Sequence, residues 1–480
     1  MADVSGAPSK PIPPSDQTWL HMDRPNNLMH VRSLMSFDGE PDLDSVRSVL
    51  RERLIDRYPV FSRRAVQRGG AWYWEDDDDF DLTRHVSEVR LDGDERDLRQ
   101  WMGDRFSEPL DSDLPLWDVT LVSGIEGHGS VLFSRFHHAL ADGVRLTQLL
   151  FSLCDPIDGV PQTASVGREP AAGGLLSTGA KAVRQGLGDL VDVSVGAMLW
   201  PVRAAGSLGS SLRAGLGFVR HPRRLVTAVE GIASDDNASV NTAAELSRLL
   251  ATPPNTGAAW SGVPGVAKRV AWADGLDLDR IKEIGREDDA TVNDVLMGLV
   301  ARGVERYLTE RGTPQREIAW LVPVSLLPFD DNLPEELGNH FALVFLPMPL
   351  RNADLRAAIA TMQERMSRVK NSVQPSITFG LQWMIAQTPQ AIAYRLTNYF
   401  ANKTAGLLTN VPGPRQAMTF AGVPVAGVLG WVPTSGNQSV GLCIFSYDGQ
   451  VSIGISGDAV LVPDPERIAE LIVEELAAHR

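Results

Sequence analysis

The chain has 480 residues, of which 43% are hydrophobic and 22% are charged, and its formal net charge is −15. This length is sufficient for two or three domains, and the composition is that of a globular protein with buried cores. Nonspecific nucleic-acid binding depends on clustered Lys and Arg that neutralise phosphates, so the acidic balance argues against a nucleic-acid partner.

The two cysteines, Cys154 and Cys443, form no CxxC pair, which indicates a reducing compartment and predicts no disulfide. Residues 1–15 lack a basic start followed by an apolar run, so we expect a loose tail there and no signal peptide. No stretch approaches the roughly 18 apolar residues that span a bilayer. We therefore expect a cytoplasmic protein whose contact with the inner membrane or lipid droplets would be peripheral.

The stretch His137-His138-Ala139-Leu140-Ala141-Asp142-Gly143 lies where a predicted strand over 131–136 runs into a predicted helix over 144–153. Because side chains alternate along a strand, His137 and His138 should point to opposite faces. A neutral imidazole can take the proton from a hydroxyl that attacks a thioester. The pattern therefore favours acyl transfer with His138 as the general base, while His137 packs. A structural alternative is that the pair only ends a buried strand.

Asp142 has two architectural interpretations: it caps the helix that follows, or it pairs with an arginine that holds the histidine turn in shape. A direct Asp142–His138 dyad ranks behind both. Since neighbouring residues that face opposite ways cannot bind one ion, and no further ligand cluster is evident, we predict no metal site.

Residues 166–261 are rich in Gly, Ala and Ser, with an excess of basic residues in the middle of the segment. Apolar residues recur three and four apart between Leu187 and Leu199, which predicts amphipathic helix. We interpret the segment as a helical crossover between two halves. The alternative is a contact with an anionic membrane or lipid-droplet surface.

The second half is predicted to begin with a strand over 268–272 and to contain a helix over 292–308. Thr291-x-x-Asp294 fits a capping box, which alone would account for Asp294. Asn293, at the same helix terminus, could bind a thioester carbonyl or its oxyanion. Near the end, Asp448-Gly449 predicts a hairpin turn, and a final helix should start at Pro465.

Further motifs accompany the histidine pair in a fixed order along the chain. They are Asn27-Leu28-Met29-His30-Val31, Pro115-Leu116-Trp117, Thr291-Val292-Asn293-Asp294-Val295, Leu337-Gly338-Asn339 and Asn410-Val411-Pro412-Gly413-Pro414. With HHxxxDG, this set resembles the bacterial wax ester synthase/diacylglycerol acyltransferase family. Thr409 stands where that family usually has serine, which keeps a hydroxyl but adds a methyl and so affects the fine shape of the pocket.

The resemblance implies an α/β fold of two chloramphenicol-acetyltransferase-like domains, each a mixed β-sheet with helices, with an active-site tunnel at their interface. Together with the change in composition, it suggests an N-terminal domain over 1–165, a helical crossover linker over 166–261 and a C-terminal domain over 262–480. Three apolar segments, 343–348, 384–385 and 407–408, are candidate tunnel walls or ordinary core.

The resemblance also implies direct transfer of a fatty acyl group from acyl-CoA to a long-chain alcohol or diacylglycerol, without a cofactor. No G-x-S-x-G elbow occurs, which disfavours a covalent route. Two alternatives are an acyltransferase that uses a carrier-protein donor and a noncatalytic lipid-surface protein. The candidate catalytic residues are His138, His137 and Asp142, and the candidate substrate-binding residues are Asn293, Asp294, Gly143 and Asn410.

Overall fold

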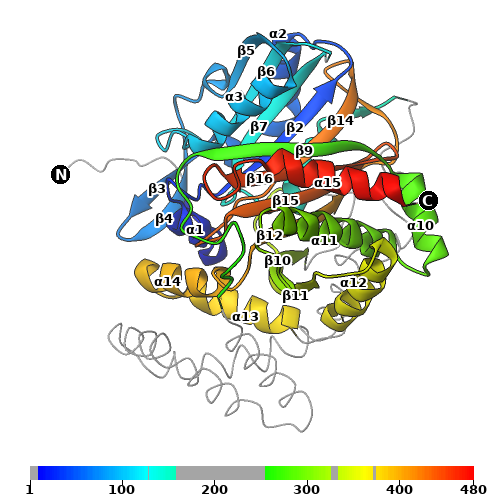
Figure 1. Cartoon of the computed structure of the whole chain (residues 1–480). Helices are drawn as coiled ribbons and strands as arrows, with labels where there is room; N and C mark the ends of the chain where they lie inside the picture. Colours follow the sequence, from blue (N-terminus) through cyan, green and yellow to red (C-terminus); the bar gives the residue numbers. More distant parts are fainter. Residues whose placement is uncertain (1–8, 128, 158–253, 326–332, 371–373, 480) are drawn as a thin grey trace.

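The computed structural model describes residues 9–127, 129–157, 254–325, 333–370 and 374–479. Each half of the chain builds most or all of one large mixed β-sheet with helices packed on it. The two units lie against each other (Figure 1). The predicted α/β fold of two sheet-bearing domains is thereby confirmed. Most of the predicted crossover, residues 166–253, lies outside the described residues.

The first sheet has seven strands in the order β5-β6-β7-β2-β14-β13-β8. They are β5 (Val86–Gly93), β6 (Trp117–Ile125), β7 (Ser130–His137), β2 (His30–Phe37), β14 (Val423–Trp431), β13 (Met418–Phe420) and β8 (Asp155–Pro156). Helix α3 (Glu95–Ser107) packs on one face through Leu98, Met102 and Phe106. Helices α2 (Leu43–Leu50) and α4 (Gly143–Ser152) pack on the other, so both faces of this sheet are buried.

A separate three-stranded sheet contains β1 (Ser9–Pro11), β4 (Ala71–Asp76) and β3 (Arg63–Arg68). Helix α1 (Pro14–Met22) follows β1 and begins with proline at its first position, where no backbone donor is needed. The expectation of a loose tail is therefore wrong for residues 9–15, because pairing of β1 with β4 and the start of α1 order them.

The second sheet has six strands in the order β11-β10-β12-β15-β16-β9. They are β11 (Phe341–Pro349), β10 (Glu317–Ser325), β12 (Gly406–Pro412), β15 (Val440–Tyr447), β16 (Gln450–Asp458) and β9 (Lys268–Asp277). One face packs against a large core formed with α10 (Leu278–Glu287), α11 (Val292–Glu310), α12 (Leu355–Lys370) and α15 (Pro465–Ala478). The other face carries α13 (Gln374–Ala386) and α14 (Gln390–Ala401).

Strands β13 and β14 come from the second half of the chain but belong to the first sheet. β14 pairs antiparallel with β2, with Leu429 opposite Leu34 and Trp431 opposite Arg32. No pattern in the sequence predicted this exchange. The domain ranges 1–165 and 262–480 stay a prediction, and β13–β14 is the part of the second range that completes the first sheet.

Local sequence signals account for several elements of the second half. Asp448 and Gly449 both have positive φ (45° and 76°) between paired strands β15 and β16, as a two-residue type I′ hairpin requires. Helix α11 begins with the predicted capping box, in which Thr291 and Asp294 exchange hydrogen bonds with each other's backbone amides. The final helix starts at Pro465, as predicted.

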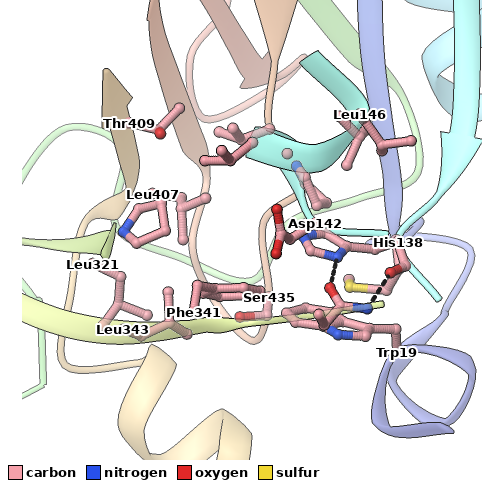
Figure 2. Close-up of a pocket in the computed structure, with 18 of the residues that line it drawn as sticks. Trp19, His138, Asp142, Leu146, Leu321, Phe341, Leu343, Leu407, Thr409 and Ser435 are labelled. Carbon is pink, nitrogen blue, oxygen red and sulfur yellow. Dashed lines mark hydrogen bonds between the residues drawn. The ribbon is translucent and has the colours of Figure 1, made fainter. Parts of the chain in front are cut away.

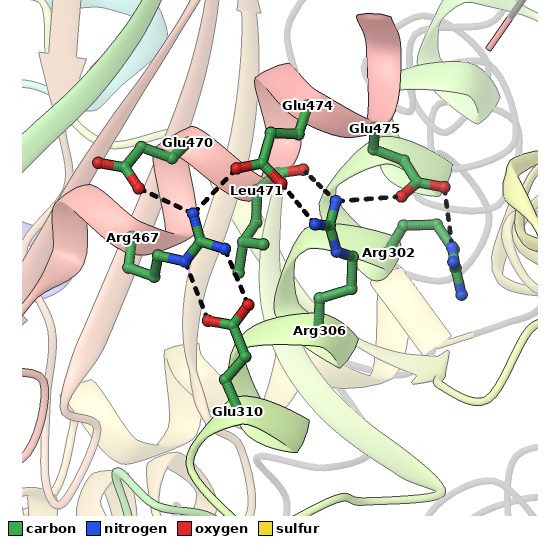
Figure 3. A network of polar contacts seen from close by, with 8 residues as sticks. All are labelled: Arg302, Arg306, Glu310, Arg467, Glu470, Leu471, Glu474 and Glu475. Atoms are coloured by element: carbon green, nitrogen blue, oxygen red, sulfur yellow. Dashed lines mark hydrogen bonds and ion pairs between the residues drawn. The ribbon is translucent and has the colours of Figure 1, made fainter. Parts of the chain in front are cut away.

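Surface side chains of α11 and α15 form a continuous chain of ion pairs that holds the last helix onto the second half (Figure 3). Arg467 of α15 binds Glu310 of α11 with two hydrogen bonds of 2.8 and 2.9 Å. At the other end, Arg302 binds Glu475 at 3.0 Å, and these two side chains are the least exposed of the network. The network lies outside the cavity described below, so we infer that it stabilises the packing of α15 on α11.

Candidate active site

A cavity of about 340 Å³ lies between the two sheets and is lined by residues of both halves (Figure 2). Its lining from the first half includes Met29, Val31, Phe136, His138, Leu146 and Leu150, and from the second half Leu321, Leu343, Phe345, Ile385, Leu407 and Thr409. Most of these side chains are apolar, which is typical of a site for a lipid chain with a few polar groups at the reacting centre.

Strand alternation decides which residues of the predicted tunnel segments reach this cavity. On β11, Leu343 and Phe345 line it, whereas Val344 and Leu346 point into the helical core. On β12 the same rule separates Leu407, which lines the cavity, from buried Leu408. Each of these two strand segments therefore contains wall and core residues in turn, as the twofold period of a strand requires. Ile385 of α13 is also a wall residue.

His138 lies in the turn between β7 and α4, at the cavity wall. Its backbone N–H donates to the carbonyl of Met29 at 2.7 Å. The imidazole stacks on the indole of Trp19 from α1, with ring centroids 4.0 Å apart and an angle of 15° between the planes. Phe341 approaches the ring from the second half at 5.6 Å. Met29 therefore fixes the backbone of His138, while Trp19 and Phe341 contact its ring from two other segments.

Asn339 determines which nitrogen of His138 carries the proton. The Asn339 Nδ2 group donates to Asp16 Oδ1 and to the backbone carbonyl of His138, both at 2.9 Å, so its Oδ1 faces Nδ1 of His138 at 2.9 Å as an acceptor. Nδ1 of His138 must then be the donor, and Nε2 holds the lone pair. Among the described residues, no group forms a hydrogen bond with Nε2.

Burial keeps this imidazole neutral. Loss of hydration lowers the pKa of His138 to about 4, although hydrogen bonds to its own backbone and to Asn339 act in the opposite direction. At neutral pH the ring is therefore the unprotonated form that can accept a proton. The hydrogen-bond arrangement and the pKa agree on the same state of the side chain.

His137 points to the other face of the sheet and does not line the cavity. Its Nδ1 accepts a hydrogen bond from the Ala139 amide at 3.1 Å, and its Nε2 lies 3.7 Å from a carboxylate oxygen of Asp23. The ring of His30 is its aromatic neighbour, at 5.9 Å between centroids. The opposite orientations expected for the two adjacent histidines are thus present, and the contacts of His137 are those of a residue that shapes the turn.

The Asp142 carboxylate joins the histidine turn to the second half. One oxygen accepts the backbone N–H of Arg145 at 2.9 Å and caps α4; the other accepts the backbone N–H of His340 at 2.9 Å. The Asp142 amide donates to the carbonyl of Gly338, whose φ of 60° lets the loop before β11 turn toward the motif. Of the interpretations weighed from sequence, the geometry matches the helix cap. His138 Nδ1 bonds Asn339, and no arginine among the described residues forms an ion pair with Asp142.

The four predicted substrate-binding residues occupy two places. Gly143, the first residue of α4, lines the cavity, and a side chain at this position would meet nothing within 4 Å. Asn293 and Asn410 hydrogen-bond each other at 2.8 Å on the face of β12 that points away from the cavity, and Asp294 makes the capping box. None of these three lines the cavity, so their role in substrate binding stays a prediction.

Comparison with known proteins shows the family of this chain. A model of the wax ester synthase/diacylglycerol acyltransferase catalytic domain matches residues 12–296, and one of the WS/DGAT C-terminal domain matches residues 337–479. This chain belongs to the wax ester synthase/diacylglycerol acyltransferase family. It is accordingly an acyltransferase, as the ordered motifs predicted.

Relatives of the WS/DGAT family cover nearly the whole chain. A probable diacylglycerol O-acyltransferase of Mycobacterium tuberculosis is 24% identical over 455 residues, covering 91% of this chain and 88% of the relative. Another chain of that organism, named provisionally for the same activity, is 27% identical over 505 residues and covers 96% and 95%.

Solved structures agree on the fold. The wax ester synthase/diacylglycerol acyltransferase from Marinobacter aquaeolei VT8 matches with a TM-score of 0.65 at 18% identity over 98% of both chains. The first condensation domain of the calcium-dependent antibiotic synthetase matches with a TM-score of 0.56 at 14% identity, over 99% of this chain and 97% of that domain.

Two residues that contribute to the WS/DGAT site were not singled out from sequence. Asn339 was noted only as part of Leu337-Gly338-Asn339, a motif without an assigned role, and Asp16 follows directly after the presumed tail. The motif was the one usable signal for Asn339. Nothing in the pattern around Asp16 links it to a residue more than 300 positions away.

Proposed function

We propose that this acyltransferase moves a fatty acyl group from acyl-CoA directly to the hydroxyl of a long-chain alcohol or of diacylglycerol, without an acyl-enzyme. The observation that carries the proposal is the state of His138: a neutral imidazole at the wall of an apolar cavity, with Nδ1 bonded to Asn339 and Nε2 without a hydrogen-bond partner among the described residues. Such a nitrogen is suited to take the proton of a hydroxyl.

In the proposed step, Nε2 of His138 removes the hydroxyl proton as the oxygen attacks the thioester carbonyl. The tetrahedral intermediate then collapses, the C–S bond breaks, and the imidazolium returns the same proton to the CoA thiolate. Since burial disfavours the charged ring, proton return to a thiolate is downhill. The proton balance closes without any other acid or base.

The thiols of the chain support direct transfer. Cys443 lines the cavity, but burial raises its pKa to about 12, so it stays protonated at neutral pH and is a poor nucleophile. Cys154 is also buried, with its pKa raised to about 12. Neither cysteine is suited to form an acyl-enzyme.

The test is CoA release by purified protein from palmitoyl-CoA with hexadecanol or with diacylglycerol, with the products separated by chromatography. His138→Ala should lower turnover by roughly 10²-fold or more, the scale of a positioned acid/base. His479→Ala, which removes an imidazole after α15, is the matched control and should keep full activity. Full turnover by His138→Ala would contradict the mechanism, and CoA release without acceptor would indicate a thioesterase.

A second donor class follows from the fold, which this chain shares with condensation domains. Those domains belong to a synthetase, so an acyl group on a carrier protein or on pantetheine is the alternative donor. Ester formation from acyl-pantetheine or an acyl carrier protein, with none from acyl-CoA, would replace the proposed donor. Turnover with free acyl-CoA at the rates usual for enzymes would exclude the alternative.

We also propose a cytoplasmic protein in peripheral contact with a membrane or lipid-droplet surface, because its lipid substrates reside there. No helix in the described part of the chain is both long and apolar enough to cross a bilayer. The basic segment with Arg220, Arg223 and Arg224 lies outside the described residues. Flotation with anionic vesicles that is lost on charge reversal at these arginines would support a contact made by this segment. Flotation unchanged by that reversal would refute the role of these arginines, and no flotation of the wild type would refute the contact itself.

A further inference from the structure

Asp16 occupies an unusual position for a carboxylate. It is only 4% exposed, in the first turn of α1, and lies beside the cavity-lining residues Ser15, Thr18 and Trp19. Its Oδ1 accepts the Asn339 side-chain amide at 2.9 Å and the Ser15 hydroxyl at 3.3 Å. A buried carboxylate is retained only where its hydrogen bonds offset the loss of hydration. No arginine or lysine among the described residues pairs with it.

We propose that Asp16 is a positioning residue of the acyl-transfer reaction, which fixes the tautomer and the orientation of His138 through the side-chain amide of Asn339. The inference rests on the proposed role of His138 as the base. Asp16 touches neither the cavity-facing nitrogen nor a substrate, so its effect is transmitted entirely by Asn339.

The hydrogen bonds leave the Asn339 amide one favourable orientation. Its Nδ2 faces two acceptors, the carboxylate of Asp16 and the carbonyl of His138, while its Oδ1 faces Nδ1 of His138. A flip of the amide would turn Oδ1 toward two acceptors and Nδ2 toward Nδ1. The proton of His138 would then have to move to Nε2, which removes the lone pair that the reaction needs.

The charge of Asp16 strengthens this preference. A hydrogen bond to an ionised carboxylate is stronger than one to a neutral carbonyl, so Asp16 holds the amide more firmly than the His138 carbonyl alone could. Burial, with a smaller contribution from the charge of Asp142, raises the pKa of Asp16 to about 6, while the hydrogen bonds from Asn339 and Ser15 act in the opposite direction. The carboxylate is therefore ionised in an assay at pH 8.

The network also joins three parts of the chain that are far apart in sequence. Asp16 lies on α1, His138 follows β7, and Asn339 precedes β11 of the second half. Trp19, one turn after Asp16 on the same helix, stacks on the His138 ring. Helix α1 therefore positions the imidazole in two ways. Trp19 stacks on the plane of the ring, and Asp16 acts on Nδ1 through Asn339.

The direct test is NMR of full-length protein labelled with ¹⁵N-histidine, because ring nitrogen shifts distinguish the two neutral tautomers. The chain has nine histidines, and the spectrum of His138→Gln identifies the signals of His138. The wild type should show the Nδ1–H form. Asp16→Ala should lose the uniform Nδ1–H signal. Asp16→Ser, a shorter side chain still tolerated in a first helical turn, serves the same purpose if the alanine variant does not fold.

Kinetics at pH 8 give the second readout. Asp16→Ala or Asp16→Ser should lower kcat by about 10- to 100-fold, by analogy with the partners that orient metal-binding histidines, with KM for acyl-CoA nearly unchanged. Asp16→Asn keeps an acceptor oxygen for Asn339 and should restore most of kcat. Asp44→Asn, at an exposed first-turn carboxylate of α2, is the matched control and should behave as wild type.

Retention of the Nδ1–H signal in the folded Asp16→Ala or Asp16→Ser protein would overturn the inference. Equal loss of kcat in Asp16→Asn and Asp16→Ala would do the same, because the asparagine preserves the contact that is proposed to matter. The inference and the proposed function can fail separately: the spectrum reports on the amide and the tautomer, whereas turnover of His138→Ala reports on the base.

Discussion

Replacement of Asp142 measures how strongly the histidine turn depends on the second half of the chain. In Asp142→Ala the cap of α4 is lost, which costs about 1 kcal/mol. The His340 amide also loses its acceptor in a partly buried bond, for which the cost of an unpaired buried N–H, about 1–3 kcal/mol, is the upper limit. The sum is a loss of at most about 2–4 kcal/mol in the free energy of unfolding.

Asp142→Asn should be milder. The amide keeps one acceptor oxygen, so only one of the two backbone N–H groups is left unpaired. Burial raises the pKa of Asp142, which means that the ionised carboxylate is unfavourable in the folded protein, and a neutral side chain relieves part of that penalty. We expect a loss of roughly 1 kcal/mol, with turnover of the folded enzyme largely kept.

The assay is urea unfolding of both variants next to Asp277→Ala, which removes an N-cap at α10 that, in the described part of the chain, bonds only within its own helix. The excess loss of Asp142→Ala over Asp277→Ala measures the bond to His340. Equal losses in these two variants would show that the bond contributes nothing. An Asp142→Asn protein with wild-type stability and no activity would refute the architectural role and favour a chemical one.

Three further predictions concern other parts of the molecule. Burial raises the pKa of Asp16 from 3.8 to about 6, so between these pH values the folded protein keeps a proton that the unfolded chain has released. Stability should therefore fall as the pH rises through this window, by on the order of 3 kcal/mol, and a parallel pH profile for Asp16→Asn would contradict this. His137→Ala should lower stability by roughly 1–3 kcal/mol, since the Ala139 amide loses its acceptor in a buried site, while kcat falls less than in His138→Ala. An equal loss of kcat with intact folding would disprove this division of roles. In the network of Figure 3, Arg302→Ala should lower the melting temperature more than Arg467→Ala, because the Arg302 side chain is 16% exposed and that of Arg467 is 31% exposed. Salt at 1 M NaCl should reduce the effect of the Arg467 substitution most. The reverse order of the two melting temperatures would show that exposure does not govern these ion pairs.

Local patterns were sufficient to predict the elements that carry the motif. The strand before the histidines and the helix after Asp142 follow from apolar spacing over a few residues, and the I′ turn at Asp448-Gly449 follows from residues that tolerate positive φ. Alternation along β7 also gave the opposite orientations of His137 and His138. Each of these features depends on neighbours within one element.

The contacts that complete the site could not be predicted in this way. The bonds from Asn339 span 201 residues to His138 and 323 residues to Asp16, and no periodicity relates such positions. Asn410 illustrates the same limit. The residue is in a recognisable motif, yet the register of β12 places Thr409 in the cavity wall and Asn410 against Asn293 on the other face. A shift by one residue would exchange these two roles.

The exchange of β13 and β14 implies that the half carrying the histidines does not fold without the other half. In a fragment of residues 1–165, β2 would lose its neighbour β14 and become an exposed sheet edge, with Leu34 and Phe37 deprived of part of their cover. The same fragment lacks Asn339 and the His340 amide, so Asp142 and Nδ1 of His138 would lose their partners as well. We therefore expect the fragment to aggregate or to unfold without a cooperative transition in circular dichroism. A cooperative transition in the isolated fragment would mean that the first sheet is stable without β14, and that the second half is needed only to form the cavity.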